Sequence, residues 1–507
     1  MEIIQDGRSR IDISCRVDVA EGMEILTSSP AVQKQQQITL EFLLSNHPLD
    51  CPVCDDAGEC DLQNFYISYG PQDSRMREVK RRKSKAVDIG LSIMLDSERC
   101  VLCSRCARFT AEITKTHELG IFGMGSTEEL NVYPGKRLDN EYAGNVVDLC
   151  PVGALTDKDF RFKRRVWYLR SAPSVCQLCA RGCNVRIDYD VNPFHEQKSG
   201  FQMRTHRTEP TACQRIQRIK PRVNLDVNAY WICDHGRYGY KPTDAADRLL
   251  TPMVKLEGRL QPVSQSEAVK QMAAGILAGM KGGGQKVAVI VSPQLTTEEI
   301  YAAWTLFIHK LGLLSVDHRL PIPEDWRGDD LLKSPDPFPN RTACEWLGVT
   351  PGLNGVRLTN LSEAIQAGKV DTLVAIGAHP QEFFSEETLR KIKRCYGILR
   401  NLPEDQLMLY DAVLPASGWG EYRGSFINFQ GRIQRLEAAL EPLGQAQPVW
   451  KLLSELSAAL KKPLGWTNPD DAWRSLNDRL PYLRGITLEA IGSEGLILTL
   501  DQFKATA

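Results

Sequence analysis

The cysteines Cys100, Cys103 and Cys106 are each separated from the next by two residues, and Cys150 follows far downstream, directly before Pro151. Three thiolates at this spacing can hold one corner of an iron–sulfur cluster, and a cysteine before proline is the usual closing ligand of such a run. Zinc is the alternative, because Cys-x2-Cys pairs also bind zinc. The third evenly spaced cysteine and the Cys-Pro pair favour an iron–sulfur cluster. This stretch is therefore expected to carry electrons.

The late arrival of the closing cysteine indicates a modified ferredoxin arrangement. In a two-cluster ferredoxin the Cys-Pro follows its triplet within a few residues. Here that near partner is missing, so we interpret the region from about residue 90 to 160 as a two-cluster ferredoxin fold that holds one cluster.

A second constellation lies upstream, with one histidine and three cysteines in a short loop. Its imidazole and thiolates can hold a [4Fe–4S] cluster or a zinc ion of the Cys3His type. A neutral imidazole in place of a thiolate removes one negative charge, which is expected to raise a cluster's reduction potential. The candidate ligands are His47, Cys51, Cys54 and Cys60.

A third constellation combines a triplet with a distant cysteine, and its fourth ligand is open between two residues. Cys233 is favoured because Trp231 precedes it and a Gly-Arg pair follows closely. Cys213 is the rival, in a polar, basic stretch that resembles an insertion. The candidate ligands are Cys176, Cys179, Cys183 and Cys233.

Composition limits the class of protein. The 507 residues suffice for about three domains, and 42% hydrophobic with 25% charged residues are ordinary for a globular chain. The net charge of −1 gives no reason to expect nucleic acid as a partner, and the basic residues between 75 and 85 are interpreted as a solvated face or a protein-docking patch. No apolar run of about 18 residues is present, so no transmembrane helix is expected. The polar, acidic start makes export unexpected.

The fifteen cysteines fit metal sites better than disulfides, because eleven of them fall in these three constellations. After Tyr240 they thin out and the pattern becomes α/β. The apolar runs 286–291 and 370–376 predict buried parallel strands, with 406–414 as a third candidate. Residues 297–311 and 450–460 predict helices. Near the N-terminus, strands are expected at 11–15 and 22–25, and a helix end at 40–44.

The motifs together strongly resemble one family over nearly the whole chain. The His47 loop, the Cys100 triplet closing at Cys150-Pro-Val-Gly-Ala, and the Cys176 set closing at Cys233-Asp-His-Gly-Arg occur in the family's order. Asp411-Ala-Val-Leu-Pro-Ala follows, with Glu421 and Arg432 behind it. This order resembles the large, 75 kDa-type iron–sulfur subunit of respiratory complex I, which is the G subunit of bacterial NADH–quinone oxidoreductase.

The resemblance implies a relay of three [4Fe–4S] clusters that carries electrons from a flavin/NADH-binding subunit toward quinone. It implies α+β ferredoxin-like domains followed by a layered α/β domain like that of molybdopterin oxidoreductases, without molybdenum. It also implies other peripheral-arm subunits as partners and a place at the cytoplasmic face of a bacterial inner membrane, through the complex and without direct insertion. No NADH-oxidising site is expected in the chain alone. The expected domains are 1–30, 31–75, 76–170, 171–240 and 241–507.

The chain departs from the family at three points. The family begins with a [2Fe–2S] domain holding four cysteines, and Cys15 matches only the last, so that cluster is expected only if upstream cysteines are supplied. The gap between Cys183 and Cys233 is longer than usual, and the C-terminal region is shorter than in many members.

Three other functions remain as alternatives. A catalytic molybdenum enzyme such as a formate dehydrogenase would need a metal ligand, for which Cys344 is the loosely placed candidate. A diaphorase-type subunit of a hydrogenase would share the His47 and Cys100 motifs without needing the C-terminal half. A zinc-stapled interaction protein would hold zinc in place of iron.

Overall fold

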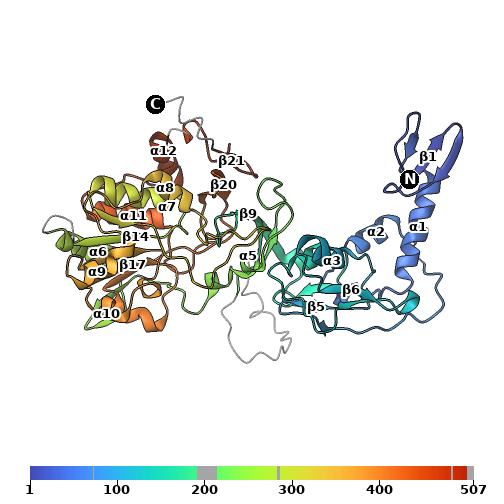
Figure 1. Cartoon of the computed structure of the whole chain (residues 1–507), viewed down its shortest axis with the longest axis horizontal. Helices are drawn as coiled ribbons and strands as arrows, with labels where there is room; N and C mark the ends of the chain where they lie inside the picture. Colours follow the sequence, from blue (N-terminus) through green and yellow to red (C-terminus); the bar gives the residue numbers. More distant parts are fainter. Residues whose placement is uncertain (72, 191–213, 282–285, 481–482, 499–507) are drawn as a thin grey trace. The chain divides into compact units, whose positions relative to one another are not determined.

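The structure is a computed structural model that describes residues 1–71, 73–190, 214–281, 286–480 and 483–498. The chain divides into two compact units, Met1–Leu169 and Arg170–Ala507 (Figure 1). The finer division into five domains stays a prediction. Cys213 and the glycines at 282–284 lie outside the described residues.

The first unit begins with a small antiparallel sheet in the order β2-β1-β3. Its strands are β1 (Glu2–Gln5), β2 (Arg8–Ile11) and β3 (Glu24–Leu26). The predicted strand at 11–15 is wrong: Ile11 ends β2, because the Asp12 carboxylate accepts from the amide of Ile13 and a turn follows. The exposed Cys15 lies in that turn.

Two helices frame the His47 loop. Helix α1 (Pro30–Leu44) begins where the Ser29 hydroxyl accepts from the amide of Val32, with proline in its first turn. It ends at Leu44, which confirms the predicted helix end. The short 3-10 turn η1 (Cys51–Val53) and helix α2 (Asp61–Tyr69) follow.

The Cys100 region is held by two further small sheets and short helices. Strand β5 pairs with β8 so that Leu95 lies opposite Leu155. This pairing brings the chain that enters the Cys100 triplet beside the chain that leaves Cys150-Pro151. The elements are β4 (Val87–Asp88), β5 (Ile93–Leu95), β6 (Leu119–Phe122), β7 (Glu129–Val132), β8 (Leu155–Asp157), α3 (Arg105–Arg108), the π-helical turn η2 (Phe109–Ile113), η3 (Gly125–Thr127), α4 (Asn145–Leu149) and η4 (Val166–Tyr168).

The second unit opens with an antiparallel sheet in the order β11-β10-β9. Its strands are β9 (Leu169–Val175), β10 (Asn184–Asp190) and β11 (Ile216–Pro221), followed by α5 (Asp234–Tyr238) and η6 (Lys241–Asp244). The Cys176 triplet occupies the connection between β9 and β10, and Cys233 directly precedes α5.

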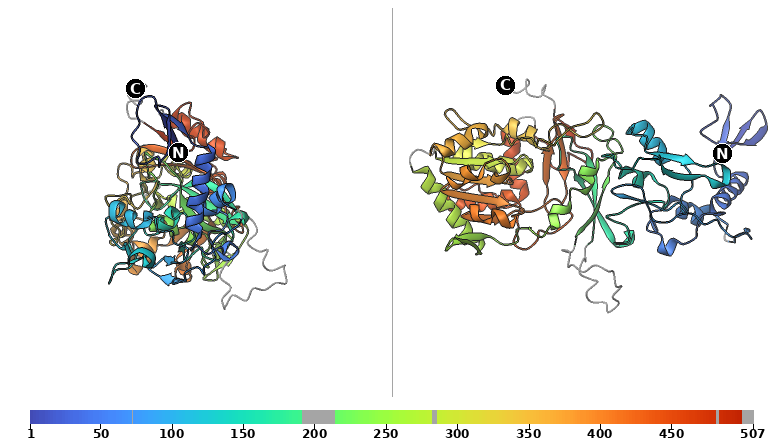
Figure 2. Two further views of the ribbon diagram at one scale, coloured as in Figure 1. Left: turned by 90° about the vertical axis from the view of Figure 1, so that its right-hand side faces the viewer. Right: turned by 60° about the horizontal axis from the view of Figure 1, so that its bottom comes forward.

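A seven-stranded sheet in the order β13-β12-β18-β17-β16-β14-β15 forms the centre of this unit (Figure 2). The five strands from β18 to β15 run parallel, and β12 joins β18 antiparallel. The strands are β12 (Met253–Leu256), β13 (Arg259–Pro262), β14 (Val287–Val291), β15 (Ser315–Asp317), β16 (Thr372–Ile376), β17 (Arg394–Leu399) and β18 (Ala412–Pro415).

Two apolar cores cover the two faces of this sheet, because successive strand side chains point to opposite sides. On β14, Val287, Val289 and Val291 enter one core, while Ala288 and Ile290 enter the other. The helices around the sheet are α6 (Gln265–Met280), α7 (Thr297–Ala303) with its π-helical continuation η7 (Trp304–Lys310), α8 (Arg341–Leu347), η8 (Leu358–Asn360), α9 (Leu361–Gln366), η9 (Pro380–Glu382), α10 (Glu386–Arg390), η10 (Glu404–Leu409), α11 (Val449–Ala459) and α12 (Pro469–Arg479).

The predicted strands at 286–291 and 370–376 are confirmed by β14 and β16, and the predicted helices by α7 with η7 and by α11. The third candidate strand is partly wrong. Residues 404–409 form the 3-10 helix η10, and β18 begins only at Ala412, directly after Asp411, whose amide donates to the carbonyl of Cys395 in β17. Strand β17 was missed.

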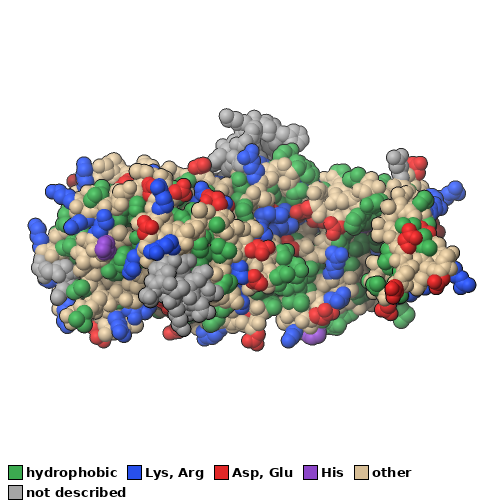
Figure 3. All heavy atoms as spheres, turned by 90° about the horizontal axis from the view of Figure 1, so that it is seen from above, with side chains coloured by type: hydrophobic (Ala, Val, Ile, Leu, Met, Phe, Trp, Pro, Cys, Tyr) green, Lys and Arg blue, Asp and Glu red, His purple; other side chains and the backbone are tan. Residues whose placement is uncertain are grey.

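A small antiparallel sheet of β19 (Gly424–Ile427), β20 (Arg432–Leu436) and β21 (Leu496–Ile497) completes the fold. Charged side chains of both signs are spread among apolar ones on the face seen in Figure 3, as the balanced charge implies. Among the described residues, no helix is long and apolar enough to span a bilayer.

Candidate metal centres

The four cysteines of the Cys100 site (Cys100, Cys103, Cys106 and Cys150) line one small hollow, and Cys103 among them is exposed. Left-handed backbone at Leu102 (φ 54°) and Ser104 (φ 60°) turns the triplet back on itself before α3 begins. The rest of the wall is mostly aliphatic, with Val101, Leu102, Ile121, Leu130, Val152, Ala154 and Leu155. The structure thus brings together four thiols from two distant stretches of chain.

Burial dominates the electrostatics of this site. It raises the pKa of the Cys106 thiol to about 12, and the neighbouring Cys150, Cys100 and Cys103 add to that rise. It also raises the pKa of Cys150 to about 12, although backbone amides of Val152, Leu155 and Ala154 oppose the rise. Thiols in such a wall ionise when a metal replaces their protons, so loading of the site is coupled to proton release.

The Cys176 site (Cys176, Cys179, Cys183 and Cys233) lines a second enclosed hollow, with Leu178, His235, Trp326, Leu332 and Lys333. All four cysteines are buried, at 6% exposed or less. The amide of Cys176 bonds the carbonyl of Cys183 over 2.9 Å, which closes the loop between β9 and β10. The fourth thiol in this hollow is that of Cys233.

Local backbone explains why Cys233 fits there. Its sulfur caps α5 and accepts from the amide of Gly236 over 3.4 Å. A Cβ at Gly236 would lie 3.0 Å from the Cys176 sulfur, so the position has room for little beyond glycine. Burial, followed by the charges of the other thiols, raises the pKa of Cys176 and Cys183 well above the ordinary value.

The His47 site (His47, Cys51, Cys54 and Cys60) lies in the loop between α1 and α2. Cys54 and Cys60 are buried and Cys51 is half-buried in η1. Burial raises the pKa of Cys60 to about 11, and a smaller contribution comes from the charge of Cys54. The structure therefore brings Cys54 and Cys60 close together.

The surroundings of His47 favour its neutral form, which can act as a metal ligand. Burial lowers its pKa, and its buried Nδ1 atom has no hydrogen-bond partner. A neutral imidazole nitrogen is the form that binds metals. His47 and Cys54 both lie within electrostatic reach of Asp50 and Arg99, which places them in one neighbourhood.

The chain around Cys150 supports the His47 site, which the local motif did not predict. The Cys60 sulfur lies 3.6 Å from the carbonyl oxygen of Pro151, and the amide of Asp61 donates to the same oxygen. A Cβ at Gly153 would lie 2.5 Å from the Cys54 sulfur. In the sequence, only the glycine of Cys-Pro-Val-Gly could have indicated this close approach.

The two sites of the first unit share an apolar wall. One core cluster contains Cys60 with Leu40, Leu62, Val152 and Ala154, and the half-buried Cys100 and Cys150 pack against it. Within the described residues, no three His, Cys, Asp or Glu side chains form a group suited to a single metal ion.

Two cysteines of the second unit lie outside these sites. Cys344 is fully buried in the larger apolar core, and Cys395 is buried in the smaller one. A cavity of about 610 Å³ opens at the carboxyl ends of β14, β16, β17 and β18, where Ser292, Gly377 and Arg400 line it. Cys344 does not line that cavity.

Three family comparisons match successive parts of the chain. The iron–sulfur binding region of NADH-ubiquinone oxidoreductase-G matches residues 36–75, which contain the His47 site. The ferredoxin-like domain of NADH-quinone oxidoreductase subunit 3 matches residues 90–156. The molybdopterin oxidoreductase family matches residues 340–459.

Comparison with whole protein sequences points to the same group of proteins. The G subunit of NADH-quinone oxidoreductase from Rickettsia felis is 27% identical over 570 aligned positions, covering 90% of this chain and 80% of that protein. The chain resembles the G subunit of NADH-quinone oxidoreductase. Its ferredoxin-like iron–sulfur domains precede a molybdopterin-oxidoreductase-type α/β domain, as expected from the sequence.

Other relatives have a higher sequence identity to this chain, over shorter stretches. The G subunit from Streptomyces coelicolor is 38% identical over 300 residues, 59% of this chain and 32% of that protein. The mitochondrial 78 kDa subunit of NADH-ubiquinone oxidoreductase from Neurospora crassa is 36% identical over 59% of this chain and 37% of its own length. The chain thus spans about a third of the length of these curated relatives. A solved NAD+-reducing [NiFe]-hydrogenase matches 32% of this chain and 70% of that chain at 25% identity, with a TM-score of 0.29.

Proposed function

We propose that this chain is an electron-transfer subunit of an NADH-quinone oxidoreductase, with one [4Fe–4S] cluster in each of the three sites. The observation that carries the proposal is that two sets of four cysteines, each drawn from distant stretches of sequence, line one small hollow apiece. The proposed ligands are His47, Cys51, Cys54 and Cys60; Cys100, Cys103, Cys106 and Cys150; and Cys176, Cys179, Cys183 and Cys233.

The residues present suit such a group. Such a cluster accepts and releases one electron at a time, with a potential set by charge, hydrogen bonds to sulfur and solvent exposure. The walls of the Cys100 hollow are mostly aliphatic, and they bury Cys106 while Cys103 stays exposed. Backbone amides that face Cys150 and Cys233 stabilise the thiolate form.

The neighbouring steps belong to other subunits in this proposal. Electrons enter from a flavin/NADH-binding subunit and leave toward quinone, so the isolated chain oxidises no NADH. The names of the relatives, which are subunits of NADH-quinone oxidoreductase, support membership of such a complex. The complex holds this chain at the cytoplasmic face of a bacterial membrane. A [2Fe–2S] cluster at Cys15 would require further cysteines from upstream of this chain.

A catalytic molybdenum enzyme is less well supported. The 610 Å³ cavity occupies the carboxyl edge of the parallel sheet, which is where open α/β sheets bind ligands. The candidate thiol ligand, Cys344, is fully buried in an apolar core instead. We therefore propose that the C-terminal half acts as a scaffold without molybdenum.

A metal inventory with EPR tests this function. Anaerobically prepared full-length chain should contain about twelve irons, from three four-iron clusters, with neither zinc nor molybdenum in stoichiometric amount. Dithionite should reveal separate reduced-cluster signals. The variants Cys106→Ala and Cys183→Ala should each lose about four irons and a different signal. Stoichiometric zinc or molybdenum, or the same spectrum from both variants, would refute the proposal.

A further inference from the structure

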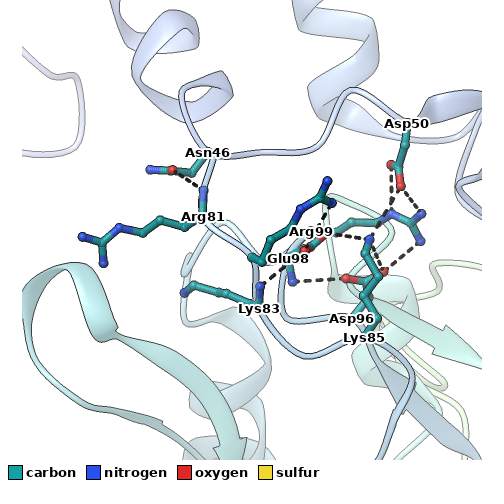
Figure 4. A network of polar contacts seen from close by, with 9 residues as sticks. Asn46, Asp50, Arg81, Lys83, Lys85, Asp96, Glu98 and Arg99 are labelled. Atoms are coloured by element: carbon teal, nitrogen blue, oxygen red, sulfur yellow. Dashed lines mark hydrogen bonds and ion pairs between the residues drawn. The ribbon is translucent and has the colours of Figure 1, made fainter. Parts of the chain in front are cut away.

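Asp50 organises the ligand loop of the His47 site. Its carbonyl oxygen accepts from the amides of Val53 at 2.9 Å and Cys54 at 3.0 Å, so its backbone shapes the turn that carries Cys51 and Cys54. Its carboxylate points away from that turn toward the chain that enters the Cys100 site (Figure 4). Whatever fixes this carboxylate therefore also fixes the turn.

Arg99, the residue before Cys100, holds that carboxylate. Its Nε donates to Asp50 Oδ1 over 3.2 Å and its Nη2 to Oδ2 over 2.7 Å, a two-pronged pair (Figure 4). Its Nη1 lies 3.2 Å from Asp96 Oδ2. The Arg99 side chain is 6% exposed, that of Asp96 5% and that of Asp50 30%, so the guanidinium itself is buried, and the two-pronged geometry adds to the strength of its bond with Asp50.

Two lysines of the basic run contact this region, whereas Arg75 and Arg82 of the same run stay largely exposed, as expected of a solvated face. Lys80 Nζ donates to the carbonyl oxygens of Leu44 at 2.9 Å and His47 at 2.6 Å. Lys85 Nζ lies 2.7 Å from Glu98 and 3.5 Å from Asp96. These lysines support the same loop, but Lys85 is 41% exposed and divides its charge among several carboxylates. Arg99 is the buried cation of the network.

Arg99 is linked to both sites, to the first by its charge and to the second by its place in the chain. Burial raises the pKa of the Cys54 thiol, and the Arg99 guanidinium opposes that rise. The same guanidinium contributes to the lowered pKa of His47, after burial. On the other side, Arg99 directly precedes Cys100 in the chain, and the two sites share the apolar wall described above. A fixed positive charge favours the reduced, more negative state of a redox centre.

We propose that Arg99 is a positioning residue shared by the His47 and Cys100 sites, which ties the ligand loop of one to the chain entering the other and places one buried positive charge beside both. The inference rests on the proposed function, because it assigns clusters to these two sites. It makes the two centres electrostatically coupled to one side chain. A change at Arg99 should therefore alter both centres together.

Redox-titrated EPR of the full-length chain tests this role. Arg99→Gln removes the charge, so the midpoint potentials of both centres should fall. Arg99→Lys keeps the positive charge but loses the two-pronged hydrogen bond to Asp50, so the midpoint potentials should stay near those of the wild type. Asp50→Asn leaves the guanidinium less compensated, so both potentials should rise. In all three variants, iron loss to a chelator from the His47 site should quicken by about 10–100-fold, as for other supporting partners of metal ligands.

Arg137→Gln is the matched control. Arg137 is an exposed arginine of the same unit that pairs with Asp88 and Asp139, so its loss should leave both potentials and the iron retention unchanged. The signals are assigned with His47→Ala and Cys106→Ala. If Arg99→Gln does not retain its clusters, the test rests on the rise in both potentials expected for Asp50→Asn and on the near-wild-type potentials expected for Arg99→Lys.

Unchanged potentials in Arg99→Gln, a shift at one centre only, or an equal shift in Arg137→Gln would overturn the shared role. Failure of the proposed function would show separately, as absence of the iron–sulfur signals in the wild-type chain.

Discussion

Replacing Gly153 with alanine should remove one centre and spare the others. A Cβ built there lies 2.5 Å from the Cys54 sulfur and 3.0 Å from the Cβ of Asp56, whereas ordinary contacts of a Cβ begin at 3.4 Å. The sulfur must therefore retreat by about 0.9 Å, the difference between 3.4 and 2.5 Å. Metal–ligand distances hold to within about 0.2 Å, so Cys54 cannot absorb this shift and remain a ligand.

Overpacking of this kind costs about 1–3 kcal/mol. Because 1.4 kcal/mol is a factor of ten in an equilibrium constant, the affinity of the His47 site for its iron should fall by about 5–150-fold. Iron should fall from about twelve to about eight per chain on gel filtration, with loss of the signal that His47→Ala also removes. Gly352→Ala is the control, because its Cβ would meet one atom at the ordinary distance of 3.4 Å. Full iron content and an unaltered spectrum in Gly153→Ala would refute the reasoning.

Three further changes test the second unit. Glu421→Gln leaves two buried arginine partners with a weakened acceptor, so urea denaturation should show a loss of about 3–5 kcal/mol, whereas the exposed Glu386→Gln should cost less than about 0.5 kcal/mol. Burial raises the pKa of Glu298 from 4.5 to about 7. Between these pH values the folded state binds a proton that the unfolded state does not, so the stability that this proton adds is fully present below pH 4.5 and is lost as the pH rises through 7. The stability of the wild type relative to Glu298→Gln should thus fall by about 3 kcal/mol over that range, and a flat difference would contradict the assignment. Cys233→Ser should lose one cluster by iron count while Cys213→Ser keeps it; the reverse result would make Cys213 the fourth ligand.

The features that could be predicted from the sequence are those determined by short, continuous segments of the chain. Cysteine spacing within each triplet is set by the chain itself, so the three constellations could be recognised, and the structure gathers two of them around small hollows. The all-apolar run of β14 likewise identified a strand with both faces covered.

The features that sequence reasoning missed depend on distant contacts. Neither the Arg99–Asp50 pair nor the approach of Gly153 to Cys54 has a local signature, because each joins parts of the chain that only the fold brings together. Residues 406–409 show why a local apolar run can mislead. Leu407, Met408 and Leu409 are typical of a strand, yet they form a 3-10 helix. The parallel neighbour of β18 is instead β17, which begins with the polar Arg394.

The contact between the Cys60 sulfur and the carbonyl of Pro151 has a consequence for biosynthesis. The four residues of the His47 motif leave the ribosome early and together, yet the wall that encloses them is translated much later. Arg165, which donates to the carbonyls of Cys54 and Pro52, arrives later still. A nascent chain that ends before Pro151 therefore carries every ligand of this site without the site itself. Stable delivery of iron and sulfide there has to wait for the ferredoxin-like region to close, so the order of maturation follows the fold and not the order of the motifs.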